Sequence, residues 1–154
     1  MSAINFIKQH GVDKAREVVK CAPKYSKHVI PCLDGEMYFA QREDGTWFKY
    51  SNGYGKWLEY FGKCNPLDLA YELSDIKRLV KGVDLINSVG GLTIAKKITF
   101  QKRLRNEKAT HFIQHPENQK LIQLFVRNQS KPEAAIKFDL LEQAIADYEA
   151  IYES

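Results

Sequence analysis

The chain has 154 residues, of which 44% are apolar and 27% charged, and its formal net charge is +4, values typical of one globular domain and unlike those of disordered chains. Apolar runs such as Leu121–Val126 fall well short of the roughly 20 residues that a membrane-spanning helix needs, and the N-terminal MSAINFIKQH lacks the apolar core of a secretory signal. We therefore expect a single domain, residues 1–154, in the cytoplasm and without a membrane partner.

Two short helices are predicted at the N-terminus. Ser2 is placed to cap the first helix, and apolar residues recur at helical spacing as far as His10. Gly11 is expected to end this helix, because glycine readily adopts the left-handed conformation past a helix end. A second helix is then predicted from about Asp13 to Cys21. Paired helices of this kind occur in DNA-binding proteins but are far more often packing units.

The next region is predicted to form strands. Residues 28–33 are short, β-branched and bounded by turn-forming residues, which favours an edge strand or an extended loop. Residues 38–50 are predicted to be a β-hairpin. Asp44-Gly45 suits its tight turn, and the flanking runs are rich in aromatic residues, which favour strands.

Aromatic side chains fall on both faces of this hairpin. A two-stranded hairpin is marginally stable alone, so at least one face must pack against the rest of the fold. We expect the face with Phe39 and either Phe48 or Tyr50 to lie inside, and Trp47 to pack in the core.

Three further aromatic residues surround or follow a glycine-rich turn: Tyr54, Trp57 and Tyr60. Tryptophan and tyrosine are favoured anchors of protein interfaces, because they bury a large area with few torsions to freeze. We therefore take these three residues as a candidate protein-binding site. The competing interpretation of each ring is core packing.

Three helices are predicted in the rest of the chain. Asn65-Pro66 is a good helix start and Ser74 a second cap, and the helix continues to Gly90-Gly91. Residues 92–105 indicate another helix, rich in cations. The last helix reaches Tyr152, and the spacing of Asp139 and Glu142 at its start is that of a capping box.

Between the last two helices the pattern is weaker. Residues 106–119 lack a clear period and are predicted to be a surface loop, with Thr110–Ile113 as a candidate extended stretch. Leu121–Val126 is compatible with strand or helix, and we favour strand. The sequence thus predicts an α+β fold, a helix-dominated single domain with a small antiparallel β-hairpin or sheet.

Three segments carry a resemblance to known proteins: NFIKQHGVDKAREVVKCAP, LSDIKRLVKGVDLINSVGGL and LEQAIADYEAIYES. They resemble small accessory proteins encoded by lambda-like temperate phages and prophages of enteric bacteria. Residues 28–63 and 106–135 carry little of this resemblance. It implies a phage origin, expression in the bacterial cytoplasm and a nonessential accessory role. Its motifs are helix patterns, so no catalytic residue is transferred.

The sequence gives little support to metal binding or catalysis. Three cysteines without a C-x-x-C pair argue against a disulfide framework and a zinc ribbon. The alternative is a zinc site made by Cys21, His28, Cys32 and Cys64, whose spacing matches no familiar zinc module. No glycine-rich phosphate loop, H-E-x-x-H or G-x-S-x-G motif is present. We therefore expect no metal, no cofactor and no catalytic residue.

Charge is distributed unevenly along the chain. Residues 133–154 hold six acidic residues and one lysine, whereas cations gather at Lys96, Lys97, Lys102, Arg103, Arg105 and Lys108. Such a basic cluster can neutralise phosphates without reading sequence. The alternatives are a solvated helix face, or a partner for the acidic C-terminal helix in the same or a neighbouring molecule. We favour these alternatives, because a net charge of +4 is modest for a dedicated nucleic-acid binder.

These observations lead to two functional hypotheses. The first is a protein-binding module that acts on a host or phage protein through its exposed aromatic residues. The second is a nucleic-acid-binding protein without sequence specificity, which uses the basic cluster. A homo-oligomer is compatible with either.

Overall fold

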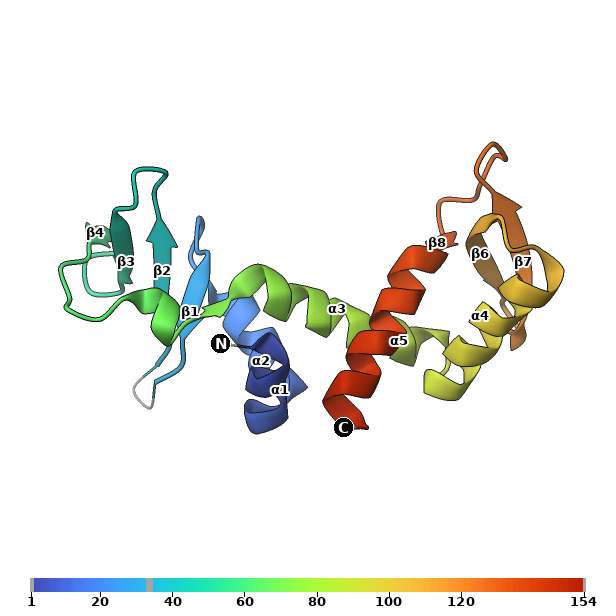
Figure 1. Ribbon diagram of the computed structural model, residues 1–154, viewed down its shortest axis with the longest axis horizontal. Coiled ribbons are helices and arrows are strands. Elements are labelled where there is room, and N and C mark those ends of the chain that lie inside the picture. The colour runs from blue at the N-terminus through green and yellow to red at the C-terminus, as the bar shows by residue number, and fades with distance from the viewer. Residues whose placement is uncertain (1, 33–34, 154) are drawn as a thin grey trace. The chain divides into compact units, whose positions relative to one another are not determined.

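The computed structural model describes residues 2–32 and 35–153 and has the predicted α+β fold (Figure 1). The chain forms two compact units, Met1–Val80 and Lys81–Ser154. The boundary between the units falls within helix α3 (Leu73–Val89). Within the described ranges, no helix has the length and apolar character that crossing a bilayer requires.

The first unit begins with the two predicted helices, α1 (Ala3–His10) and α2 (Val12–Cys21). Gly11, with a φ of 88°, separates them, and glycine adopts this conformation without the strain that a side chain would cause. Ser2 stands at the N-cap of α1 but makes no side-chain hydrogen bond. The predicted cap therefore does not form.

A five-stranded antiparallel sheet completes this unit, in the order β4-β3-β2-β1-β5. Its strands are β1 (His28–Ile30), β2 (Met37–Gln41), β3 (Trp47–Ser51), β4 (Lys56–Glu59) and β5 (Tyr71–Glu72). Strands β2 and β3 confirm the predicted hairpin, and Gly45 in its turn has a φ of 92°.

The sequence predicts an edge strand or a loop at residues 28–33; residues 28–30 do form a short strand, but its predicted edge position is wrong. Strand β1 lies inside the sheet, where it pairs with β2 and with β5. Strand β5 follows β1 by some forty residues, and a local pattern cannot reveal such a distant partner. Residues 33–34 of the predicted segment lie outside the described residues.

The two faces of this sheet have different neighbours. On the face that we call the helix side, the Tyr38 hydroxyl donates to the Val18 carbonyl of α2 at 2.8 Å, and Tyr71 lies edge-on to Phe6 of α1. On the opposite face, which we call the far side, the buried Phe39 ring is surrounded by other rings. Both faces thus contribute to the core of the unit.

The chain between β4 and α3 follows the prediction only in part. Asn65 does start a helical turn, because its Oδ1 accepts a hydrogen bond from the Leu67 amide at 3.0 Å. The turn is the short 3₁₀ helix η1 (Pro66–Asp68), and β5 follows before α3 begins. Ser74 is the second residue of α3 and not its cap. As predicted, the helix ends before Gly90-Gly91, both of which have positive φ.

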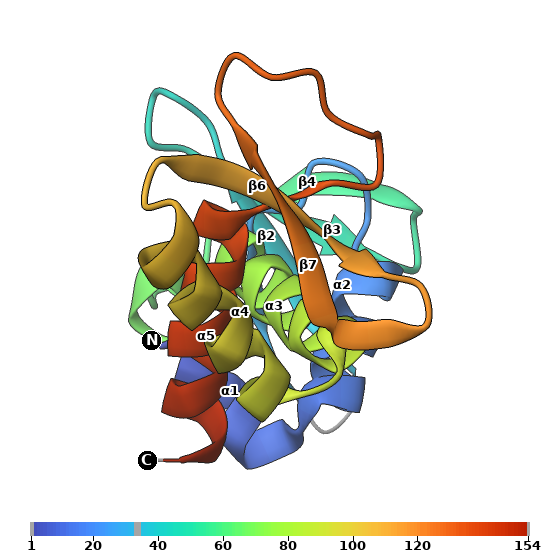
Figure 2. The ribbon, with the colours of Figure 1, turned by 90° about the vertical axis from the view of Figure 1, so that its right-hand side faces the viewer.

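The second unit combines α4 (Leu92–Arg105) and α5 (Phe138–Tyr152) with strands that include β6 and β7 (Figure 2). These strands form a three-stranded antiparallel sheet in the order β7-β6-β8. The strands are β6 (Ala109–His115), β7 (Asn118–Val126) and β8 (Ile136–Lys137). The favoured strand at 121–126 is confirmed. The predicted loop at 106–119 is wrong, because Pro116 marks the tight turn of a long hairpin.

The core of the second unit lies between its helices and its sheet. The rings of Phe112 and Phe138 meet at 4.9 Å, among buried aliphatic residues of α3, α4 and α5: Ile86, Val89, Ala95, Ile98, Leu141 and Ala144. The capping box predicted at Asp139 and Glu142 does not form, since Lys137 is the N-cap residue and makes no side-chain bond. Aspartate in the first turn still favours the helix electrostatically.

Candidate functional site

The structure does not bring the three predicted anchor residues to one surface. Tyr54 lies in the turn between β3 and β4, with 76% of its side chain exposed. Trp57 lies on the helix side, where its ring meets Tyr50 at 5.4 Å. Tyr60 follows β4 and lies on the far side, with its ring 5.3 Å from that of Phe39. Trp57 and Tyr60 therefore belong to opposite faces of the sheet.

Trp57 borders a hollow of about 270 Å³ at the β3–β4 end of the helix side. We call it the aromatic hollow, and its lining consists of Tyr25, Ala40, Gln41, Arg42, Phe48 and Trp57. The Arg42 guanidinium lies 4.3 Å from the centroid of the Phe48 ring, within the range of a cation–π contact. Arg42 makes no ion pair with another described residue.

A strained segment before β1 forms one wall of the aromatic hollow. Tyr25 has a φ of 75° and is the one non-glycine residue with positive φ in the described ranges. Trp57 holds this segment, because its Nε1–H donates to the Lys24 carbonyl at 3.1 Å. Strain of this kind persists only where neighbouring contacts impose it, and it is frequent at binding sites. The Tyr25 ring is nevertheless 70% exposed.

The expectations for the hairpin rings hold only for Phe39. Phe39 is buried, but Phe48 and Tyr50 are half-buried and lie on the opposite face. The register explains this, because Phe39 pairs with Lys49 and side chains alternate along a strand. Trp47 is also half-buried and lies edge-on to the His28 ring at 5.3 Å. It therefore lies at the margin of the core.

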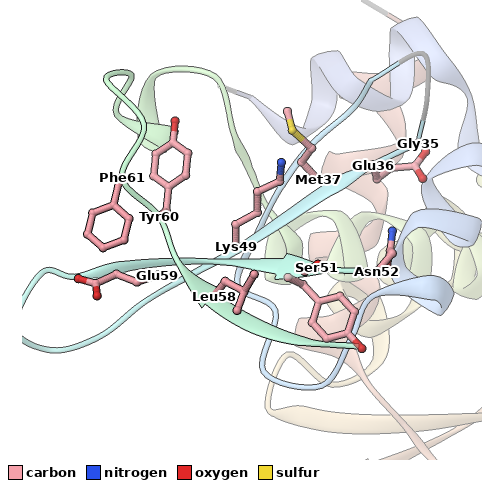
Figure 3. Close-up of a pocket in the computed structure, with 11 residues that line it drawn as sticks. Gly35, Glu36, Met37, Lys49, Ser51, Asn52, Leu58, Glu59, Tyr60 and Phe61 are labelled. Carbon is pink, nitrogen blue, oxygen red and sulfur yellow. The ribbon is translucent and has the colours of Figure 1, made fainter. Parts of the chain in front are cut away.

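A second hollow, of about 500 Å³, lies beside β4 on the far side (Figure 3). We call it the Lys49 hollow, because the Lys49 side chain projects into it between Met37 and Tyr60. Lys49 is half-buried and forms no ion pair in the part of the chain that the structure describes. Glu36 also lines the hollow, but it pairs with Lys14, which lowers the pKa of the Glu36 carboxyl. The Lys49 ammonium is thus available to an anionic group.

Three of the six cations proposed for nucleic-acid binding are engaged within the second unit. On α5, Glu149 pairs with Lys96 at 3.0 Å and Glu142 with Lys102 at 4.0 Å. Arg105 donates to a main-chain carbonyl of β7 at 3.2 Å. The acidic helix is therefore an intramolecular partner of part of the basic cluster.

The other three cations are exposed on or just after α4: Lys97, Arg103 and Lys108. Their side chains form no ion pair with a residue that the structure describes. Lys97 and Arg103 share α4 with exposed Phe100 and Leu104, so the exposed surface of this helix is partly apolar.

The residues of the alternative zinc site do not assemble in the structure. Cys21, Cys32 and Cys64 are exposed free thiols. Residues 2–32 and 35–153 hold no group of three or more His, Cys, Asp or Glu that is arranged to bind a metal ion. The Nδ1 atom of His28 is buried and has no hydrogen-bond partner among them. Burial lowers the pKa of His28 below its ordinary value of 6.5.

Sequence reasoning missed most of the residues that line the two hollows, including Tyr25, Arg42, Phe48 and Lys49. One available signal is the alternation in KWLEY after Gly55, which indicates a third strand next to the hairpin. That strand places Trp57 opposite Tyr50. No local signal identifies Tyr25, since its segment meets Trp57 across 33 residues of sequence.

Comparisons of the chain with protein-family models, curated proteins and solved structures give no match.

Proposed function

We propose that this protein is a phage- or prophage-encoded binding module that acts in the bacterial cytoplasm on a host or phage protein, through the aromatic hollow. One observation carries the proposal: aromatic rings and an arginine without an ion-pair partner line an open depression on a sheet face. Tryptophan, tyrosine and arginine are the residues that most often dominate the energy of protein interfaces. The phage origin rests on the resemblance of the three segments described above.

The dimensions of the aromatic hollow support an anchoring role. Its volume of about 270 Å³ lies just below the range of roughly 300–1,000 Å³ that is common for small-molecule sites, so it suits one side chain of a partner. The rings of Tyr25, Phe48 and Trp57 supply apolar contact area. Arg42 supplies hydrogen-bond donors for an acidic group beside that side chain.

Nucleic acid is the second candidate partner, and the exposed cations Lys97, Arg103 and Lys108 favour it. We rank it below a protein partner because the other half of the basic cluster is engaged in contacts within the second unit. Lys96 and Lys102 must give up an ion pair with α5 before they can neutralise a phosphate, and the Arg105 guanidinium already directs one of its N–H groups to β7.

The proposal is tested in two steps. Proteins are captured from a nuclease-treated lysate of the bacterial host, and each captured protein is then produced and titrated against purified variants. We expect Trp57→Ala to raise the Kd about 30-fold or more, because truncation of an interface anchor costs about 2 kcal/mol or more. Tyr54→Ala is the matched control, since its ring is exposed but lines neither hollow.

Two further variants keep this test independent of folding. Trp57→Phe retains a ring but loses the bond to Lys24, and Arg42→Gln changes only an exposed end group. Equal losses for Tyr54→Ala and Trp57→Ala would exclude the aromatic hollow as the interface. Capture that nuclease abolishes, together with salt-dependent DNA or RNA binding that Lys97→Ala and Arg103→Ala weaken, would establish nucleic acid as the partner.

A further inference from the structure

Strand β4 is one of the two outer strands of the five-stranded sheet and pairs with β3 alone. The Tyr60 amide donates to the Trp47 carbonyl at 2.8 Å, which marks a hydrogen-bonded pair of this ladder. Hydrogen-bonded and non-hydrogen-bonded pairs alternate along antiparallel strands. The main-chain N–H and C=O groups of Trp57 and Glu59 therefore point away from β3.

This outer edge is open in the described ranges. The main-chain groups of Trp57 and Glu59 form no hydrogen bond with another described residue. A row of unpaired N–H and C=O groups is a template for a further strand, and proteins usually shield it with proline, a bulge or a covering element. Exposed apolar side chains lie in or just after β4: Leu58 and Phe61.

The far side of this edge is positively charged. Along β4 its side chains are those of Lys56 and Leu58, and Lys49 pairs with Leu58 from β3. Figure 3 shows the Lys49 amino group in the Lys49 hollow, between Met37 and Tyr60. Neither lysine forms an ion pair with a described residue. A new strand would place alternate side chains on this face next to that of Lys56, with Lys49 one strand further into the sheet.

We propose that an extended, acidic segment of a partner protein adds to β4 as a sixth strand. Its main chain bonds to Trp57 and Glu59, and its far-side acidic side chains lie next to Lys56, with Lys49 one strand further into the sheet. The alternate side chains of the same segment lie on the helix side, beside Trp57 at the rim of the aromatic hollow. This inference rests on the proposed function, because it specifies the conformation and charge of the segment that the binding module recognises.

A second copy of the chain fits this edge less well. In an antiparallel pair of two β4 strands, Trp57 and Glu59, whose main-chain groups face outward, can stand opposite only Trp57 or Glu59 of the copy, because both residues of a hydrogen-bonded pair must face the partner strand. In the registers that pair Trp57 or Glu59 in this way, Lys56 meets Leu58, Tyr60 or Gly62 of the copy. No such register gives Lys56 an acidic partner, so self-pairing leaves both lysines unneutralised. Charge complementarity therefore favours a different, acidic chain.

The test is a selection of binders to the full chain from a random peptide library, followed by synthesis of the selected consensus. We expect acidic residues at alternate positions. Methylation of every second amide nitrogen should raise the Kd tenfold or more, while methylation of the intervening ones changes it little. Only every second amide of an added strand bonds to β4.

Two variants of β4 locate the binding edge. Glu59→Pro removes an N–H that points away from β3, so it should abolish peptide binding with the β3–β4 ladder retained. Glu59→Ala, which keeps that N–H, is the matched control and should bind normally. Lys56→Glu should reject the acidic peptide and accept one in which the facing acid is replaced by lysine.

Other results would overturn the inference. Selected peptides without alternating acids, or amide methylation that is tolerated throughout, would mean that the segment docks in another conformation. In that event, a loss of binding in Trp57→Ala would leave the aromatic hollow as the interface and preserve the proposed function. If Glu59→Pro binds the peptide normally, β4 is excluded as the binding edge. If light scattering detects a dimer of the wild type that Glu59→Pro dissociates, the edge of β4 pairs with a second copy of the chain.

Discussion

The two units of the chain differ in whether side chains bond to the main-chain groups of an outer strand. In the second unit α4 covers β7: Gln101 donates to the Lys120 carbonyl at 2.9 Å and Arg105 to the Ile122 carbonyl at 3.2 Å. In the first unit no described residue bonds to the outward main-chain groups of β4. Two main-chain carbonyls of β7 are therefore bonded by side chains of the same unit, whereas the outward main-chain groups of β4 are open to a partner.

This difference shows that cationic residues that cannot be distinguished in the sequence have different roles in the structure. Gln101 and Arg105 are four residues apart, so they lie on one face of α4 and both reach β7. Lys49 and Lys56 lie on strands, where nothing in the described part of the unit neutralises them. Arg105 thus serves the fold, and the lysines beside β4 remain available for binding.

The largest effect on the free energy of unfolding is expected in the core of the second unit. Phe112→Ala should lower the free energy of unfolding by about 3–5 kcal/mol, the cost of truncating a fully buried phenylalanine, because its ring is 0% exposed. Denaturant titration followed by circular dichroism measures this. Leu121→Ala on β7 is the control, since this side chain is 56% exposed. Equal losses in the two variants would contradict the core assigned to the second unit.

An intermediate effect on the free energy of unfolding is expected at the two tryptophans of the first unit. Trp47→Ala should cost about 2 kcal/mol, since truncation of a fully buried tryptophan costs about 3–5 kcal/mol and Trp47 is half-buried. Trp57→Ala should cost less, about 1 kcal/mol, mainly through the lost hydrogen bond to Lys24. The same denaturation curves decide this. If Trp57→Ala costs as much as Trp47→Ala, both rings serve the fold, and the aromatic hollow loses its support as an interface.

Local signals were sufficient for most of the helices and for one hairpin. Gly11 and Gly90-Gly91 stop helices through conformations that other residues rarely adopt, and Asp44-Gly45 forms the predicted turn. The apolar stripe that ends at Tyr152 predicts α5. In each case the physical cause lies within a few residues of the feature that it determines.

The remaining features depend on pairing between distant segments. Strand β5 has two residues and exists because it pairs with β1. The positions of Phe48 and Trp57 follow from a register that no local pattern fixes, because a shift of one residue moves every side chain to the other face. The same holds for Arg105, whose role depends on β7. The lining of the hollows could therefore not be predicted from the sequence, although the sequence does single out several of their aromatic residues.

A smaller effect is expected when the covered edge is opened. Arg105→Met removes the hydrogen bond to β7 and should cost about 1 kcal/mol, the usual net value of such a bond. It should also promote association, because a β7 carbonyl becomes free to pair with another chain. Denaturation and light scattering measure the two effects. Arg103→Met is the matched control, as Arg103 is exposed on the same helix. Association of both variants alike would mean that lost charge, and not the edge, is responsible.

The smallest effect should appear as a pH dependence of the free energy of unfolding, caused by His28 in the first unit. Burial lowers the pKa of His28 below 6.5; nearby Glu72 raises it and Lys27 lowers it, both by less than burial does. The unfolded chain therefore binds more protons than the folded chain as the pH falls below 7, so the free energy of unfolding should fall between about pH 7 and pH 5.

The variant His28→Gln isolates this contribution. Its unfolding free energy should depend less on pH over this interval than that of the wild type, as seen in denaturation curves at several pH values. His111→Gln gives the same measurement of pH dependence in the second unit, where burial also lowers the pKa of His111. Carboxylates such as Glu36, whose pKa lies below 4.5, lose their contribution only at lower pH. An unchanged slope for His28→Gln would show that the folded protein accommodates a proton on this ring, and that the Nδ1 atom has access to water or another acceptor.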